Sequence, residues 1–150
     1  MTAEHFLVPV DFSEYSDYAL DYALSLAPQL QARLTLLHIL QPLIVGGADM
    51  GMGLPYTYVQ QLEEETNQSM QKCLDRVNAA GLKGEGMVVH GVPWQEIIDM
   101  AKNRHNDLII MGTHGRTGIK HVLLGSVAEK VVRLAPCPVL VVRLPENQDK

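Results

Sequence analysis

The sequence predicts an α/β fold, namely a doubly wound five-stranded parallel sheet with helices on both faces, in one domain over residues 1–150. Short apolar runs alternate with amphipathic stretches, a rhythm typical of repeated strand–helix–strand crossovers. Each apolar run is nearly continuous in apolar side chains, as expected for parallel strands that are covered on both faces. A length of 150 residues fits a single compact domain.

Five apolar runs are the predicted strands. They are short, and most are bounded by polar residues, glycine or proline. The predicted strands cover Phe6–Val10, Leu34–Ile39, Met87–Val89, Leu108–Met111 and Val139–Val142.

Four stretches between the strands carry apolar residues three and four positions apart, the spacing of one helical face. Ser13 is placed to cap the first stretch, and Gly81 follows the second, where glycine commonly ends a helix. Pro93 stands in the first turn of the third. The predicted helices cover Ser13–Ala27, Val59–Ala80, Pro93–Lys102 and Ser126–Leu134.

Two segments fall outside this rhythm. The connection over about residues 41–56 contains four glycines and is long for this fold class, so we expect a flap that is mobile or disordered. A polar tail follows at about residues 145–150.

The composition argues against several classes of protein. With 47% hydrophobic and 19% charged residues, the chain has the material for a core, and a net charge of −5 disfavours nucleic-acid binding. No apolar stretch approaches the roughly 18 residues of a membrane span, and no basic segment precedes a long apolar run as in a signal peptide. We therefore expect a cytoplasmic protein that binds neither nucleic acid nor membrane. Cys73 and Cys137 are expected to be buried, reduced thiols.

Ligands of open parallel sheets bind beyond the carboxyl ends of the strands, so the residues there are the candidate site. Asp11 follows the first strand, where a carboxylate is costly without a partner. The alternative is a local role at the start of the next helix, and one side chain can do both. His38 lies within a strand and is interpreted as a hydrogen-bonded core histidine, and Trp94 as a packing residue.

The loop after the fourth strand is rich in glycine. Gly112 and Gly115 can adopt backbone angles that turn successive N–H groups into a concave anion site. Gly125 and Ser126 stand before the last helix, whose free N–H groups, with Ser126 as a capping hydroxyl, form a second anion site. The alternative is a glycine-rich turn followed by an ordinary capped helix.

Side chains in and after this loop add to the predicted anion site. Arg116 and Lys120 supply positive charge, and His121 lies beside them in the sequence. His114 is placed to donate to a phosphate or to brace the loop.

The spacing Gly-x2-Gly-x9-Gly-Ser, formed by Gly112, Gly115, Gly125 and Ser126, resembles the ATP-binding signature of the universal stress protein family. Three further segments resemble the family in the same order along the chain. They are Val8–Ser13, Leu37–Ile39 and Pro136–Val142.

The resemblance implies a fold like that of the adenine nucleotide alpha hydrolases, in which ATP is bound with Mg²⁺ or Mn²⁺ on its phosphates and is not rapidly turned over. It also implies a homodimer that pairs the last strands, Val139–Val142, edge to edge. The implied nucleotide-binding residues are Pro9, Val10, Asp11, Ile39, Met111, Gly112, His114, Gly115, Arg116, Gly125, Ser126 and Val127. The residues suggest neither a catalytic group nor a metal-binding side-chain cluster.

Three functions follow from these observations. The leading hypothesis is a stress-response regulator that binds ATP and acts through partner or self association. The second is a slow ATP-hydrolysing or autophosphorylating enzyme, because phosphoryl transfer depends mainly on positioning and charge neutralisation. The third is a dimeric interaction module that binds no nucleotide.

Overall fold

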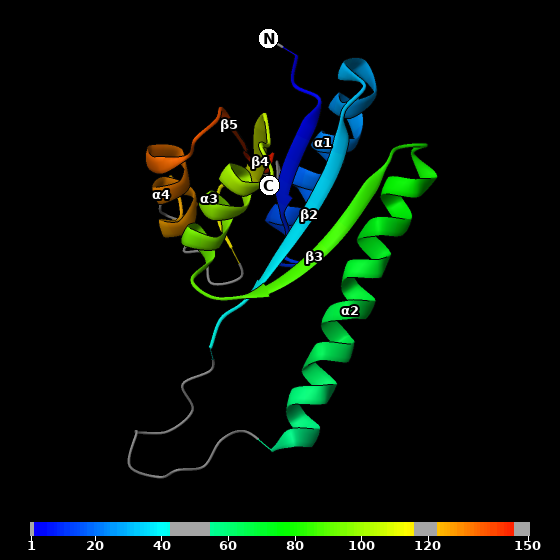
Figure 1. Ribbon diagram of the computed structural model, residues 1–150, viewed down its shortest axis with the longest axis vertical. Helices are drawn as coiled ribbons and strands as arrows, with labels where there is room; N and C mark the ends of the chain where they lie inside the picture. Colours follow the sequence, from blue (N-terminus) through cyan, green and yellow to red (C-terminus); the bar gives the residue numbers. More distant parts are fainter. Residues whose placement is uncertain (1, 43–54, 116–122, 146–150) are drawn as a thin grey trace, which may run out of the picture.

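A computed structural model describes residues 2–42, 55–115 and 123–145. Its strands form one parallel sheet in the order β3-β2-β1-β4-β5 (Figure 1), which confirms the predicted doubly wound fold. The elements are β1 (His5–Pro9), α1 (Glu14–Leu30), β2 (Arg33–Leu40), α2 (Tyr56–Ala79), β3 (Gly84–His90), α3 (Pro93–Asn103), β4 (Leu108–Gly112), α4 (Ser126–Leu134) and β5 (Val139–Val142).

The ends of the predicted elements differ from the observed ends by at most three residues. The largest shift in a strand is at β3, which starts at Gly84 rather than Met87. A Cβ atom at Gly84 would lie 2.7 Å from the Cγ1 atom of Val77, so α2 packs against the backbone of this strand. Glycine thus serves close packing here, although it usually weakens a strand.

Most of the predicted flap, residues 43–54, lies outside the described residues. Tyr56, predicted as the last flap residue, is instead the first residue of α2. Of the predicted tail, Pro145 is described and residues 146–150 are not.

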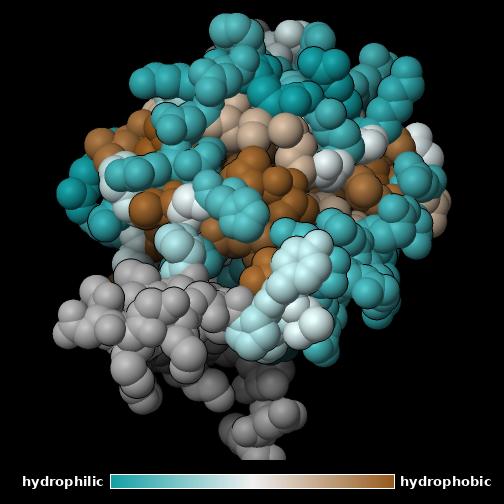
Figure 2. Space-filling view, turned by 60° about the horizontal axis from the view of Figure 1, so that its bottom comes forward, coloured by the Kyte–Doolittle hydropathy of each residue, from teal (hydrophilic) through white to brown (hydrophobic). Residues whose placement is uncertain are grey.

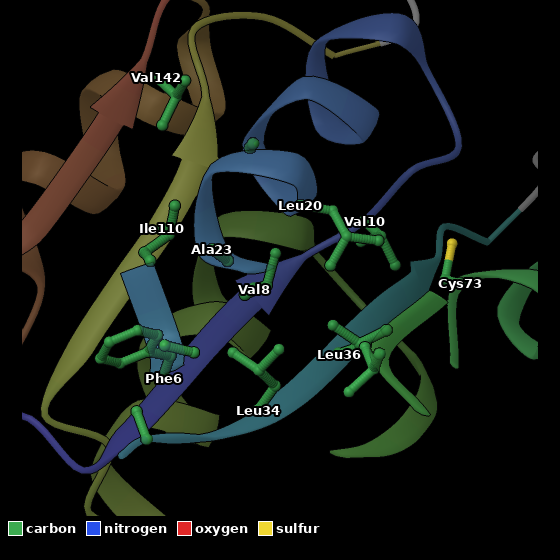
Figure 3. Close-up of a cluster of buried hydrophobic side chains, with 14 of the residues drawn as sticks. Phe6, Val8, Val10, Leu20, Ala23, Leu34, Leu36, Cys73, Ile110 and Val142 are labelled. Carbon is green, nitrogen blue, oxygen red and sulfur yellow. The ribbon is translucent and has the colours of Figure 1, made fainter. Parts of the chain in front are cut away.

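Two helices cover each face of the sheet. Successive side chains of β1 point to opposite faces and so pack against different pairs of helices. Phe6 and Val8 of β1 pack with α1 and α2 in the first buried cluster, drawn in Figure 3. Leu7 packs with α3 and α4 in the second. Both faces are apolar, as the continuous apolar runs predict.

The central strand β1 and its neighbour β4 separate toward their carboxyl ends. β1 pairs with β2 over five residues, from His5 to Pro9. It pairs with β4 only at Phe6 and Leu7. After β1, the Val10 N–H still donates to the Leu37 carbonyl of β2, at 2.8 Å. The chain therefore stays with β2 and leaves β4, which opens the sheet edge between them.

The predicted helix signals act as expected. The Ser13 side chain caps α1 by accepting from the Ser16 N–H, and Pro93 lies in the first turn of α3. Gly81, just beyond α2, has a φ of +72°, the left-handed conformation that favours glycine. Within the described ranges, no helix combines the length and apolar character that a membrane crossing requires.

Both cysteines are free thiols, Cys73 buried and Cys137 half-buried. Burial raises the pKa of each thiol, and the nearby Asp17 and Asp107 carboxylates raise the pKa of Cys73 and Cys137 respectively. Both thiols therefore stay protonated at neutral pH.

A series of hydrogen-bonded side chains links β1, β2 and β3 near the amino ends of the strands, at the edge opposite the candidate site. The His5 Nδ1 atom lies 3.4 Å from the Arg33 guanidinium, which can only donate, so Nδ1 accepts. His5 Nε2–H therefore donates to the Thr35 hydroxyl at 2.8 Å, and this hydroxyl donates to Glu85 at 3.1 Å. Glu85 is also paired with Arg104. The chain of bonds requires a neutral His5.

Burial is the main cause that lowers the pKa of His5 below 6.5, followed by the positive charges of Arg33 and Arg104. Glu85 and Asp107 oppose this shift. The folded protein therefore binds fewer protons at this site than the unfolded chain just below pH 6.5. The stabilising contribution of neutral His5 is present above pH 6.5 and declines as the pH falls below it.

We predict that a His5→Gln variant loses less of its free energy of unfolding than the wild type between pH 7 and pH 5. Glutamine keeps a donor for Thr35 but does not titrate. Urea denaturation at half-unit pH steps measures the difference, with His90→Gln, at an exposed histidine, as the control. Parallel pH curves for wild type and His5→Gln would contradict the prediction.

Candidate functional site

A cleft of about 810 Å³ lies at the carboxyl edge of the sheet, where β1 and β4 separate. Figure 2 views the molecule from this side and shows apolar side chains at the centre of the face, surrounded by hydrophilic ones. The ends of β1, β2 and β4 line the cleft together with the starts of α3 and α4 and with the first turns of α2. This is the position at which open parallel sheets bind ligands.

The structure brings together on this cleft all the predicted site residues that it describes. Arg116, with Lys120 and His121, lies outside the described residues. The predicted residues that line the cleft are Pro9, Val10, Asp11, Ile39, Met111, Gly112, His114, Gly115, Gly125, Ser126 and Val127.

Asp11 lies in the turn between β1 and α1. Its Oδ1 atom accepts the Ser13 N–H at 3.0 Å, and its own N–H donates to the Ser16 hydroxyl at 3.2 Å. The carboxylate therefore has the local role at the start of α1 that the sequence left open, and it also borders the cleft.

Phe12 has a left-handed backbone, with a φ of +62°. This conformation costs a residue with a Cβ atom about 1–2 kcal/mol, and bulky residues such as phenylalanine rarely adopt it. The Phe12 ring packs against the first buried cluster and stacks on His38, with ring centroids 4.5 Å apart and planes at 26°. Such stacking contributes about 0.5–1.5 kcal/mol beyond burial, which offsets much of the cost.

His38 of β2 is buried, and its Nδ1 atom lies 2.7 Å from the Val10 carbonyl oxygen. A carbonyl can only accept, so Nδ1 carries the proton. The interpretation of His38 as a hydrogen-bonded core histidine is confirmed. Its ring also lines the cleft, which the strand pattern alone did not indicate.

The glycines of the signature act through close approach. A Cβ atom at Gly112 would lie 2.8 Å from the Tyr15 carbonyl oxygen, and one at Gly125 would lie 3.1 Å from the Thr113 carbonyl oxygen. At Gly115 it would lie 2.9 Å from Asp11 Oδ2. Neither Gly112 nor Gly115 has a positive φ. Glycine is needed at these two positions because a Cβ atom would come too close to the Tyr15 backbone or to the Asp11 carboxylate.

The N-terminus of α4 faces the cleft without a side-chain cap. Gly125 is the N-cap residue, and Ser126 is the first residue of the helix. The prediction that the Ser126 hydroxyl caps the helix was therefore wrong, because Gly125 occupies that position and has no side chain. The first N–H groups of a helix lack partners within it and carry partial positive charge.

His114 packs beside the loop. Its Nδ1 atom lies 3.0 Å from the Thr113 hydroxyl, and its ring lies 5.2 Å from the Tyr15 ring. These contacts fit the prediction that His114 braces the loop, which was the alternative to donating to a phosphate. Trp94 packs with the second buried cluster, as predicted, and Lys130 lies 5.2 Å from its ring centroid.

The sequence profile of the universal stress protein family matches residues 2–143. The chain belongs to this family. The recognition made from the glycine signature and its accompanying segments is therefore confirmed at the level of the family.

Relatives within the universal stress protein family support this assignment. The chain is 33% identical to universal stress protein MJ0531 of Methanocaldococcus jannaschii, covering 95% of this chain and 83% of that protein. The solved structure of MJ0577 from the same organism has a TM-score of 0.85 at 30% identity, covering 98% of this chain and all of the other. A universal stress protein solved in complex with cAMP has a TM-score of 0.72 at 25% identity, and the match covers 95% of this chain and 98% of that one.

The wall formed by α2 was missed from the sequence. Tyr58 and Leu62 line the cleft, although the first buried residue of α2 is Thr66. The apolar stripe that predicts the helix includes Leu62, but nothing in it shows that the helix extends past the sheet edge. The other lining residues that were not predicted are Ser16, Leu37, His38, Leu40, Gln41, Pro42, Pro93, Ile97, Thr113, Leu124 and Ala128.

The ionisable side chains on the described lining of the cleft are those of Asp11, His38, Tyr58 and His114. Across the described residues, no three His, Cys, Asp or Glu side chains lie together in a way that would hold a metal ion. The electrostatics of the described site therefore combine one carboxylate with the partial positive charge at the N-terminus of α4.

We predict that Gly112→Ala lowers the free energy of unfolding by about 1–3 kcal/mol, because the new methyl group meets the Tyr15 backbone. Gly115→Ala costs less stability, since its methyl group meets only the end of the Asp11 side chain. Chemical denaturation of the two variants measures this order. A loss for Gly115→Ala as large as that for Gly112→Ala would contradict it.

Proposed function

We propose that this chain is a regulatory stress-response protein that binds an adenine nucleotide, with ATP as the working ligand, in the cleft between β1 and β4. The observation that carries the proposal is the meeting of Asp11 and Gly115 beside the uncapped N-terminus of α4. A relative solved with cAMP supports a nucleotide as the class of ligand.

One end of the cleft suits phosphates. The uncapped first turn of α4 offers N–H groups to an anion, as helix N-termini do in many phosphate sites. Gly112, Gly115 and Gly125 keep side chains away from this region. We propose that His114, Arg116, Ser126 and Val127 belong to this subsite, and that Mg²⁺ or Mn²⁺ is held through the phosphates.

The other end suits a base. Ile39 and Leu40 at the end of β2 and Leu62 of α2 provide an apolar lining. The Asp11 carboxylate borders the cleft beyond the end of β1, where it can accept hydrogen bonds from the hydroxyl groups of a ribose. We propose that Pro9, Val10, Ile39 and Met111 contact the nucleoside.

We propose a cytoplasmic homodimer that binds neither nucleic acid nor membrane. β5 lies at the edge of the sheet, and all four of its residues are apolar. An apolar edge strand favours pairing with a second chain. Nucleotide binding then acts through partner or self association.

We predict that ATP with Mg²⁺ binds the purified, nucleotide-free chain at one site per chain, and that Gly115→Ala weakens binding at least tenfold. The methyl group displaces the Asp11 carboxylate, at a small cost in stability. Isothermal titration calorimetry measures the affinity, and thermal denaturation controls for folding. Absence of binding to an empty wild-type protein would refute the proposed function. Rapid ATP turnover would favour an enzyme instead.

We predict that Tyr58→Ala weakens ATP binding by about 5- to 150-fold, the effect of losing one ring stacked on a base. Tyr58 lines the cleft and is 48% exposed, so its ring is available to a ligand. Tyr56 is 76% exposed and does not line the cleft, which makes Tyr56→Ala the matched control. Equal affinities for the two variants would exclude Tyr58 from the base subsite.

A further inference from the structure

We propose that His38 is a positioning residue, which holds the Asp11 carboxylate in the direction that nucleotide binding requires. The inference rests on the proposed function, because it concerns how Asp11 meets the ligand. It is carried by contacts of His38 with both sequence neighbours of Asp11.

The first contact fixes the backbone before Asp11. Val10 donates its N–H to the Leu37 carbonyl at 2.8 Å and accepts the His38 Nδ1–H at its carbonyl at 2.7 Å. Two successive residues of β2 therefore hold both polar backbone groups of Val10. The carbonyl belongs to the peptide that links Val10 to Asp11, so this peptide plane is held as well.

The second contact holds the backbone after Asp11. The Phe12 ring stacks on the His38 ring while its backbone has a φ of +62°. Left-handed residues persist only where the surroundings hold them, and such residues concentrate at ligand sites. Without the His38 ring, we expect Phe12 to relax toward negative φ, which would turn the Asp11 carboxylate away from the cleft.

The arrangement differs from ordinary core filling. His38 is 7% exposed, and its hydrogen bond joins it to Val10, the residue between β1 and Asp11. A residue that only fills space would change affinity through stability alone. A residue that acts through Asp11 changes affinity only while Asp11 is present, and a double-mutant cycle detects this dependence.

The experiment titrates ATP with Mg²⁺ into the full-length wild type, His38→Phe and His38→Asn, each also combined with Asp11→Ala. Phenylalanine keeps a ring for Phe12 but removes the donor, and asparagine keeps a donor for Val10 but removes the ring. We expect each variant to weaken binding about three- to tenfold, the effect of one neutral hydrogen bond or ring contact. In the Asp11→Ala background, we expect changes below about twofold.

Two measurements guard against an effect of stability. Val77 of α2 is buried against Gly84 of β3 and does not line the cleft, so Val77→Ala is the control for loss of packing and should keep wild-type affinity. Long-range ¹H–¹⁵N NMR of the ligand-free wild type should show His38 protonated at Nδ1. Protonation at Nε2 alone would overturn the proposal even if a variant failed to fold.

The outcomes separate this inference from the proposed function. If the wild type binds ATP and the His38 variants bind equally well, the positioning role is overturned and the proposed function stands. An equal loss with and without Asp11 also overturns it, because the His38 ring then acts on the ligand directly. If the wild type binds no nucleotide, the proposed function fails and the inference fails with it.

Discussion

The separation of β1 from β4 is the constraint on which the site depends. Right-handed crossovers place α1 and α2 on one face, because the chain moves from β1 to β3 in one direction. They place α3 and α4 on the other face, because the chain moves from β3 to β5 in the opposite direction. The helices that follow β1 and β4 therefore lie on opposite faces of the sheet. Because β1 pairs with β4 only at Phe6 and Leu7, the carboxyl ends of these two strands diverge, and the cleft forms between them.

Much of this arrangement could be predicted from local sequence. Continuous apolar runs mark the buried strands, and capping residues such as Ser13 mark the helix starts, because both depend on neighbours in the chain. The site could be placed by the rule that ligands bind at the carboxyl edge. The strand at Gly84 and the wall at Tyr58 could not be predicted, since both depend on how α2 packs in three dimensions.

The glycines show a further limit of sequence reasoning. The glycines of the signature line the cleft, but neither Gly112 nor Gly115 has the left-handed backbone that favours glycine elsewhere. The left-handed residue of the site is Phe12, whose side chain gives no sign of it. A pattern of glycines indicates that space is needed, whereas the identity of the neighbour that needs it, here Asp11 or Tyr15, comes only from the folded chain.

The overhang of α2 has a mechanical consequence. The buried stripe of α2 begins at Thr66, and Arg76 pairs with Asp17 and Asp21 of α1 near its C-terminal end. The preceding residues, from Tyr56 to Glu65, extend about 15 Å beyond these anchoring contacts, at 1.5 Å per residue. Any tilt at the anchor is amplified at Tyr58 in proportion to this length. A ligand that contacts Tyr58 can thus shift the exposed outer face of α2 as well as the wall of the cleft.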